Sequence, residues 1–259
     1  MRIVVALEYR GVGFCGWQSQ PQGCGVQDAL EAAASIIAGE KIAVTAAGRT
    51  DTGVHAAFQV AHFDTPVSRP LTAWVRGVNS HLPPGVAVLW AREVSEAFHA
   101  RFAATQRGYR YVLLNHPVRP GLHDGLIGWH HRPLDADAMN RAAAHLIGQH
   151  DFSAFRAAEC QAKSPVKELR LAHVERRGDY LLCDFRADGF LHHMVRNLMG
   201  CLIQVGAGAQ PPEWVHEILQ GRDRTLAAPT FDAAGLYLTH IRYPAHFALP
   251  ESSERWLFA

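Results

Sequence analysis

The sequence predicts an α+β fold in which helices cover one face of antiparallel sheets. Strand-like runs and amphipathic helical runs both occur, and they do not alternate strictly as they would in a parallel α/β fold. The chain has 259 residues, 48% of them hydrophobic, which suffices for one large domain or two small ones. Because the two halves repeat a similar order of elements, we expect closely packed domains over residues 1–104 and 105–259.

The first half is predicted to open with a strand, followed by a glycine-rich loop over residues 11–25. Leu30, Ala33 and Ile37 then recur at helical spacing, and Gly39 suits the end of that helix. Runs rich in β-branched residues indicate the strands. The expected strands cover 2–9, 42–47, 58–63 and 86–94, and the expected helices cover 26–38 and 70–79.

The second half is predicted from the same signals. An amphipathic run that ends at Gly148 indicates one helix, and a longer apolar run before Gly206 indicates another. Two runs separated by a short polar turn are typical of a hairpin. The expected strands cover 109–114, 169–176, 180–185 and 235–243, and the expected helices cover 135–147, 191–205 and 212–219.

Composition excludes several classes of protein. The first residues lack a basic segment followed by a long apolar one, so no signal peptide is expected. The longest apolar stretch, around 197–209, is too short and too rich in glycine for a membrane span. Five cysteines form no C-x-x-C pair, which favours reduced thiols over a disulfide framework. We therefore expect a cytoplasmic protein with no membrane partner.

The net charge of +1 does not by itself indicate a nucleic-acid partner. Arginine is nevertheless concentrated between Ala91 and Pro120, and the chain contains only three lysines. Genomic base composition would explain this preference, and so would phosphate contact by forked guanidinium donors. Composition leaves both explanations open. The arginines of this segment are Arg92, Arg101, Arg107, Arg110 and Arg119.

The segment GRTDTGVHA, residues 48–56, carries the clearest chemical signal. Two glycines bracket a short loop between strands, where backbone can approach a ligand closely. Asp51 is the only acid between Glu40 and Asp64, and Arg49 lies two positions away. A nearby arginine would favour the ionised carboxylate that a nucleophile needs. The alternative is an Asx-turn that closes a hairpin, with Arg49 as a structural partner.

A second signal is the strand that contains Arg107, Tyr109 and Tyr111. Alternation places these three side chains on one face and Arg110 on the other. Aromatic rings beside guanidinium groups suit an unstacked RNA base. Half-buried core tyrosines would give the same pattern.

Metal and nucleotide chemistry are not expected. The sixteen histidines include no pair three or four residues apart, and there is no HExxH motif or Cys/His cluster. Walker, GxGxxG and GxSxG motifs are also absent from the sequence. A single carboxylate with arginine is the chemistry that remains.

These residues resemble the tRNA pseudouridine synthase A family along nearly the whole chain. GRTDTGVHA is similar to that family's catalytic loop, with Asp51 at the position of the nucleophile. Two departures are mild: Arg10 stands where the family commonly has Asp, and Gly108 where it has a bulkier residue. The other collinear matches are Gly16–Gln18, Asn79–Pro83, Phe98–Phe102, Tyr109–Tyr111, Gly148–Arg156, His193–Arg196 and Gly235–Leu236.

The resemblance implies a fold, an activity and partners. The fold would be two ferredoxin-like (RNP-like) halves whose antiparallel sheets join around a central basic cleft. The enzyme would be a homodimer that isomerises uridine to pseudouridine at positions 38, 39 and 40 of the tRNA anticodon stem-loop. It would need no cofactor and no metal. The target base would leave the helical stack to be reached.

The resemblance also implies roles for individual residues. Asp51 would attack ribose C1′, attack C6 of the base, or remove the 2′ proton, and the sequence does not choose among these routes. Arg49 would occupy the gap left by the base or hold a phosphate, and Arg196 would pair with Asp51. Tyr109 would stack on the base, and Leu236 would supply apolar wall. Arg101, Arg107 and Arg110 are the expected RNA-binding residues.

Three alternatives remain at this point. A non-catalytic RNA-binding module would have no need for an acid among arginines, because a carboxylate repels phosphate. A pseudouridine synthase for other RNA sites fits the same residues. A small-molecule hydrolase is disfavoured, because the sequence offers no nucleophile–base pair or metal site.

Overall fold

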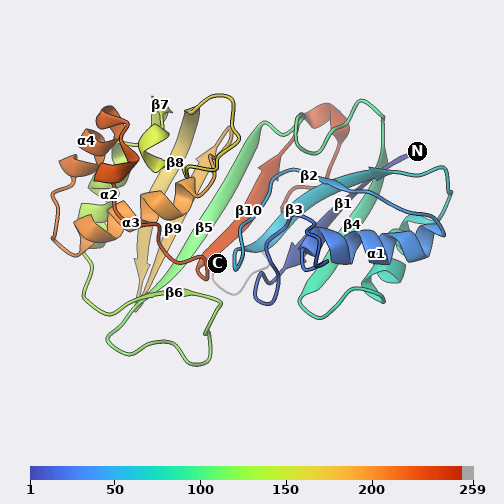
Figure 1. Ribbon diagram of the computed structural model, residues 1–259, viewed down its shortest axis with the longest axis horizontal. Coiled ribbons are helices and arrows are strands. Elements are labelled where there is room, and N and C mark those ends of the chain that lie inside the picture. Colours follow the sequence, from blue (N-terminus) through green and yellow to red (C-terminus); the bar gives the residue numbers. More distant parts are fainter. Residues whose placement is uncertain (253–259) are drawn as a thin grey trace. The chain divides into compact units, whose positions relative to one another are not determined.

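The computed structural model describes residues 1–252, and the chain divides into two compact units. The first unit comprises Met1–Gln106 together with the chain from Tyr237 onward, and the second comprises Arg107–Leu236. Figure 1 shows the elements of both. This division differs from the expected one at the C-terminal end, because the last strand belongs with the first unit.

The first unit is built on an antiparallel sheet. β1 (Arg2–Tyr9) lies between β4 (Val86–Val94) and β3 (His55–Asp64). β2 (Thr45–Ala46) pairs antiparallel with β3, which gives the strand order β4-β1-β3-β2. With one helical segment after β1 and another before β4, the unit has the β-α-β-β-α-β order of a ferredoxin-like fold.

The last strand explains why the C-terminal segment belongs to the first unit. β10 (Leu236–Arg242) runs parallel to the beginning of β3, with Tyr237 opposite His55 and Leu238 opposite Ala56. The rings of His55 and Tyr237 also stack at a centroid distance of 4.6 Å. Burial raises the pKa of Tyr237 to about 12, so its hydroxyl remains protonated.

The helix α1 (Val26–Ala38) begins and ends as the sequence predicts. At its start the Asp28 carboxylate accepts a hydrogen bond of 2.8 Å from the Gly25 N–H, which satisfies a donor that the helix leaves open. At its end Gly39 has φ 74°, and its N–H donates to the Ser35 carbonyl.

The second helical segment of this unit is centred on a π-helix, η1 (Ala73–Gly77), within the predicted range 70–79. Its Trp74 is fully buried and meets Phe63 of the sheet edge to face, with centroids 5.1 Å apart.

The second unit has a sheet with strand order β5-β9-β8-β7. β5 (Gln106–Asn115), β9 (Tyr180–Ala187) and β8 (Val166–Arg177) pair antiparallel in turn, and β7 (Gly148–Asp151) pairs antiparallel with β8. β6 (Gly128–His130) runs parallel to β5. β6 and β7 were not predicted, because their short polar sequences show no alternation.

Three helices gather beside strands β7, β8 and β9 (Figure 1): α2 (Ala136–Ala144), α3 (Met194–Gly206) and α4 (Glu213–Gly221). The Asp135 carboxylate caps α2 by accepting from the Ala138 N–H at 2.9 Å. α3 is the most buried helix of the unit, as its apolar sequence predicts. The α+β class is therefore confirmed for both units.

Short 3-10 helices complete the described elements: η2 (Ser153–Phe155), η3 (Arg224–Leu226) and η4 (Ala245–Phe247). None of the helices within residues 1–252 combines the length and the apolar character that a membrane span requires.

Candidate active site

Asp51 lies at the tip of the loop that joins β2 to β3. The Val54 N–H donates to the Asp51 carbonyl at 3.1 Å, which closes a turn, and Gly53 within that turn has φ 80°. Thr50 is buried, Asp51 is half-buried and Arg49 is exposed. The loop therefore presents a carboxylate and a guanidinium near the surface while its backbone is anchored inside.

Side chains of the sheet fix this loop from below. The Thr50 hydroxyl and the Tyr9 hydroxyl lie 2.8 Å apart in a buried hydrogen bond. The Gln59 amide donates to the Gly48 carbonyl at 2.7 Å. Burial raises the pKa of Tyr9 far above its ordinary value, so this contact stays a neutral hydrogen bond. β1 and β3 together set the position of the residues on either side of Asp51.

The glycine-rich loop between β1 and α1 fixes the Asp51 loop from a second direction. The Trp17 N–H donates to the Thr50 carbonyl at 2.9 Å. Gly16 has φ 90°, and a Cβ there would lie 2.8 Å from the Thr50 oxygen and 3.1 Å from the Asp51 carbonyl carbon. The backbone of Gly16 therefore packs directly against the backbone of Thr50 and Asp51, which leaves no space for a side chain at position 16.

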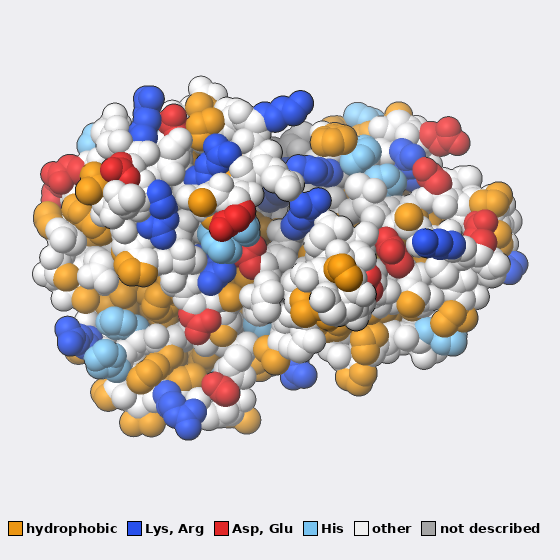
Figure 2. All heavy atoms as spheres, viewed as in Figure 1, with side chains coloured by type: hydrophobic (Ala, Val, Ile, Leu, Met, Phe, Trp, Pro, Cys, Tyr) orange, Lys and Arg blue, Asp and Glu red, His pale blue; other side chains and the backbone are white. Residues whose placement is uncertain are grey.

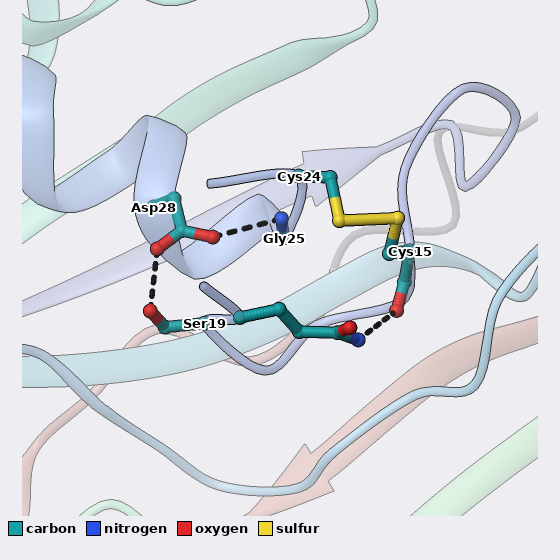
Figure 3. The surroundings of a disulfide bond; sticks show 6 residues. Cys15, Ser19, Cys24, Gly25 and Asp28 are labelled. Carbon is teal, nitrogen blue, oxygen red and sulfur yellow. Dashed lines mark hydrogen bonds between the residues drawn. A yellow bond between two sulfur atoms is a disulfide. The ribbon is translucent and has the colours of Figure 1, made fainter. Parts of the chain in front are cut away.

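A disulfide in the same glycine-rich loop corrects one expectation. Cys15 and Cys24, nine positions apart, form a disulfide bond, so the prediction of reduced thiols alone is wrong (Figure 3). The prediction failed because the two cysteines lack a recognisable spacing motif and are brought together by the fold of the loop. Cys15 directly precedes Gly16, so the bond lies one residue from the contact with the Asp51 loop. The other cysteines, Cys160, Cys183 and Cys201, are free and buried.

Arg101 is the remaining predicted site residue of the first unit. It is exposed and follows Phe98, which is fully buried. The carbon of its guanidinium lies 5.7 Å from the centroid of the Phe102 ring, within range of a cation–π contact.

In the second unit, Tyr109 and Tyr111 have different environments although they share one face of β5. Tyr109 is half-buried, and its ring meets the edge of Phe190 at a centroid distance of 5.1 Å. Tyr111 is fully buried and donates from its hydroxyl to the Asp232 carbonyl at 2.9 Å. Burial keeps the pKa of Tyr111 well above its ordinary value. Tyr111 is thus a core residue, while Tyr109 is only half-buried.

The two arginines of this strand are held by different partners. Arg107 donates to the Asp188 carbonyl at 3.1 Å. Arg110 points to the opposite face and forms a two-pronged ion pair with Asp184, its partner across the strands, at 2.7 and 3.0 Å. The Asp184 carboxylate therefore partly neutralises the charge of Arg110, which weakens the attraction of Arg110 for a phosphate.

Arg196 and Leu236 are positioned by the segment that follows α4. The Arg196 side chain donates to the Phe231 carbonyl at 2.9 Å, and the Phe231 N–H donates back to the Arg196 carbonyl at 3.1 Å. Leu236 is buried at the start of β10. A Cβ at Gly235 would lie 2.4 Å from the Val112 carbonyl oxygen, so this approach again requires glycine.

Sequence reasoning missed a buried polar network beside Arg196. The Asn197 amide is completely buried and donates to the Phe155 carbonyl at 2.8 Å. Its oxygen accepts from the Thr230 hydroxyl at 2.7 Å and from Arg224 at 3.1 Å. This network ties α3 to the segment that holds Arg196. Asparagine on the apolar side of a helix was the signal that could have revealed it.

The N-terminus of α3 carries a second unpredicted feature. His193 adopts φ 61°, which is uncommon for a residue with a side chain. This conformation also explains why α3 begins at Met194, three residues later than predicted. Strained backbone of this kind is often found at functional sites.

The predicted site residues thus fall into two sets. Arg49, Asp51 and Arg101 belong to the first unit. The second unit holds the others: Arg107, Tyr109, Arg110, Arg196 and Leu236.

Comparisons with known proteins decide the family. A family model described as tRNA pseudouridine synthase matches residues 5–103 and 142–244, which is most of the chain. The chain is 83% identical over its full 259 residues to tRNA pseudouridine synthase A of Thiobacillus denitrificans, all of which is covered. It is 58% identical to the proteins of the same name from Dechloromonas aromatica, covering 99% of this chain and 98% of the relative, and Burkholderia multivorans, covering 96% and 93%.

The chain belongs to the tRNA pseudouridine synthase family. The two segments matched by the family model include the Asp51 loop in the first unit and the Arg196 helix in the second. Tyr109 lies between these segments, but the full-length relatives extend across it. The resemblance noted from the sequence motifs is therefore confirmed. As a tRNA pseudouridine synthase, the chain is an isomerase.

Proposed function

We propose that this chain isomerises uridine to pseudouridine at positions 38, 39 and 40 in the anticodon stem-loop of tRNA. The observation that carries the proposal is the half-buried Asp51 carboxylate in a loop held on both sides, in a member of the tRNA pseudouridine synthase family. A loop that is fixed before the substrate arrives costs little further ordering when it binds.

The proposed reaction requires an ionised carboxylate and neither a metal nor a nucleotide cofactor. The bond between ribose C1′ and N1 breaks, and a bond between C1′ and C5 of the same base forms. The proton on C5 is lost, and N1 gains a proton, so the reaction is an isomerisation. Asp51 acts as the nucleophile on C1′ or C6, or as the base that removes the 2′ proton. Each of these routes restores free Asp51 at its end.

Other residues bind the substrate in this proposal. Arg49, exposed beside Asp51, contacts a phosphate or occupies the space that the extruded base leaves. The half-buried ring of Tyr109 stacks on the base, and Leu236 supplies apolar contact. Arg196, held by Phe231, offers a second fixed guanidinium.

Binding of RNA must rely on local arginines, because the net charge is only +1. Figure 2 shows basic and acidic side chains interspersed over the visible face. Arg101, Arg107 and Arg110 are the proposed phosphate contacts, and the ion pair of Arg110 with Asp184 weakens the contact that Arg110 can make. Each phosphate contact should lower log affinity by about 0.7–0.9 per tenfold rise in salt. A flat salt dependence would contradict this assignment.

We also propose that the enzyme is a cytoplasmic homodimer. The sequence resemblance to the tRNA pseudouridine synthase A family supports the homodimer. The proposed tRNA substrate supports the cytoplasmic location. Sedimentation equilibrium should give about twice the chain mass of 28.5 kDa. A mass of one chain at the concentrations used for activity would contradict the dimer.

The experiment that tests the function is a map of pseudouridine in unmodified tRNA transcripts after incubation with the enzyme. Transcripts that carry uridine at position 38, 39 or 40 should each be modified there, and transcripts with cytidine at all three should remain unmodified. Modification at other positions alone would favour a synthase of different site choice. Tight binding without any modification would favour a non-catalytic RNA-binding protein.

A further inference from the structure

Three aromatic rings in the first unit form a row that runs from the interior to the surface. His62 on β3 is buried, with 6% of its surface exposed, and its ring meets that of His99 at a centroid distance of 4.9 Å. The ring of Phe102 stacks on His99 at 4.3 Å with an angle of 29° between the planes. Phe102 is 76% exposed, so the row ends in a ring open to solvent.

The backbone on either side of His99 is anchored. Phe98 is fully buried, and its ring contacts those of Tyr243 and Phe247 at centroid distances of 4.9 and 5.1 Å. Arg2 donates to the Phe98 carbonyl at 2.6 Å. The Tyr243 hydroxyl donates to the carbonyl of Ala100 at 2.8 Å. Phe102 is therefore exposed on a segment whose backbone is held in place.

Two hydrogen bonds orient the middle ring. The Nδ1 atom of His99 accepts from the backbone N–H groups of Arg101 and Phe102, at 3.2 and 3.3 Å. An Nδ1 that accepts carries no proton, so the ring is neutral. Burial and the neighbouring Arg2 lower the pKa of His99, which favours the same state. His99 thus supports Phe102 as a flat, uncharged ring in a fixed orientation.

The surface around Phe102 combines an apolar face with positive charge. Phe102 stacks on His99 and is 76% exposed, so its ring offers an apolar, planar surface to which another planar group can bind. The Arg101 guanidinium lies 5.7 Å from the ring centroid. A nucleotide presents a flat base beside a phosphate, which is complementary to a ring beside a guanidinium.

We infer that Phe102 is a stacking platform for an unpaired base of the tRNA, with Arg101 contacting a neighbouring phosphate. The inference rests on the proposed tRNA substrate and adds to it a base-contacting surface outside the Asp51 loop. Because Phe102 binds a base other than the one that reacts, its loss weakens binding and leaves the chemical step unchanged. The row from His62 through His99 holds the platform in place before tRNA arrives.

The test compares Phe102→Ala, Phe102→Tyr and Leu122→Ala in the full-length enzyme, with an unmodified tRNA transcript as the probe. Leu122 is 89% exposed in the second unit and serves as a matched control for loss of an exposed apolar side chain. Phe102→Ala should raise Kd and KM for tRNA by about 5- to 150-fold, which corresponds to about 1–3 kcal/mol for one stacked base. Its single-turnover rate at saturating enzyme should stay within about twofold of wild type. Phe102→Tyr should restore binding, and Leu122→Ala should bind as wild type does.

Three outcomes would overturn the inference. Phe102→Ala could bind tRNA as tightly as wild type, or Phe102→Tyr could be as weak as Phe102→Ala. Sedimentation could also show that Phe102→Ala changes the oligomeric state, in which case the ring contacts a second copy of the chain. All three leave wild-type activity intact and so differ from failure of the proposed function, in which wild-type enzyme would make no pseudouridine.

Discussion

The backbone N–H of Trp17 donates a hydrogen bond of 2.9 Å to the carbonyl oxygen of Thr50, the residue before Asp51. This bond links two loops that are more than thirty residues apart in the sequence. A substitution in the glycine-rich loop should therefore change the position of the Asp51 carboxylate without direct contact with it.

Gly16→Ala should lower kcat/KM by about 100-fold. A Cβ would lie 2.8 Å from the Thr50 oxygen and displace the Asp51 loop, and small displacements of reacting groups have effects of this size. Gly13→Ala is the matched control, because Gly13 has a similar φ of 87° but nothing within 4 Å of the added carbon. Equal activity of the two variants in steady-state assays would show that the Gly16 contact does not position Asp51.

The Cys15–Cys24 bond should stabilise the protein by about 2–3 kcal/mol, since it closes a short loop in the unfolded chain. Urea unfolding of wild type should shift to lower denaturant when a thiol reductant is added. The double variant Cys15→Ser, Cys24→Ser should unfold at the same urea concentration as reduced wild type, and reductant should not change its transition. If reductant leaves the wild-type transition unchanged, the two cysteines are not bonded in solution.

His62 should make the first unit sensitive to acid. Its burial, followed by the positive charge of Arg2, lowers its pKa to about 4, while Asp64 acts in the opposite direction. Below pH 6.5 the unfolded chain therefore binds a proton that the folded chain resists, and stability falls as the pH drops from about 6.5 to about 4.

His62→Gln should remove about 1–3 kcal/mol of this pH dependence in urea unfolding measured across that range. The exposed His216→Gln is the control and should behave as wild type. Parallel pH profiles for wild type and His62→Gln would contradict a neutral buried His62.

Tyr109→Phe should bind tRNA as wild type does, because the ring and its contact with Phe190 remain. Tyr109→Ala should weaken substrate engagement by about 1–3 kcal/mol through loss of the stacking ring. Binding and single-turnover rates of both variants would be compared with their thermal stability. If Tyr109→Ala unfolds while Tyr109→Phe is fully active, Tyr109 is a core residue.

The elements that the sequence predicts best are those with local signals at both ends. α1 was placed correctly because Gly39 ends a clear apolar repeat. The strand predicted over 42–47 is reduced to β2, because the N–H groups of Ile42 and Val44 donate to Ser35 and Glu31 of α1 instead of to a neighbouring strand. Whether these N–H groups bond to a helix or to a strand depends on contacts between elements, which local sequence patterns do not reveal.

The candidate site shows the same limit. The Asp51 loop could be identified because its glycines, its acid and its arginine are contiguous. The supports beneath it could not, since Tyr9, Gln59 and Trp17 come from three separate elements. Alternation along the strand does not distinguish an RNA-facing Tyr111 from a core tyrosine. The structure shows a core tyrosine, whose hydroxyl donates to the Asp232 carbonyl.

Asp51→Asn should fold normally, because asparagine can serve in a turn as aspartate does. It should bind tRNA as well as wild type or better, since one negative charge near phosphate is removed. An amide cannot form the covalent adduct or accept a proton at neutral pH, so the reaction should stop. Circular dichroism and tRNA binding would establish that the variant is intact.

The most direct test of Asp51 as the catalytic group is single-turnover release of tritium from C5 of labelled uridine in tRNA, with enzyme in excess. Wild type should release the label, and Asp51→Asn should release none above background. Appreciable release by correctly folded Asp51→Asn enzyme, shown to be free of wild-type protein, would contradict the assignment.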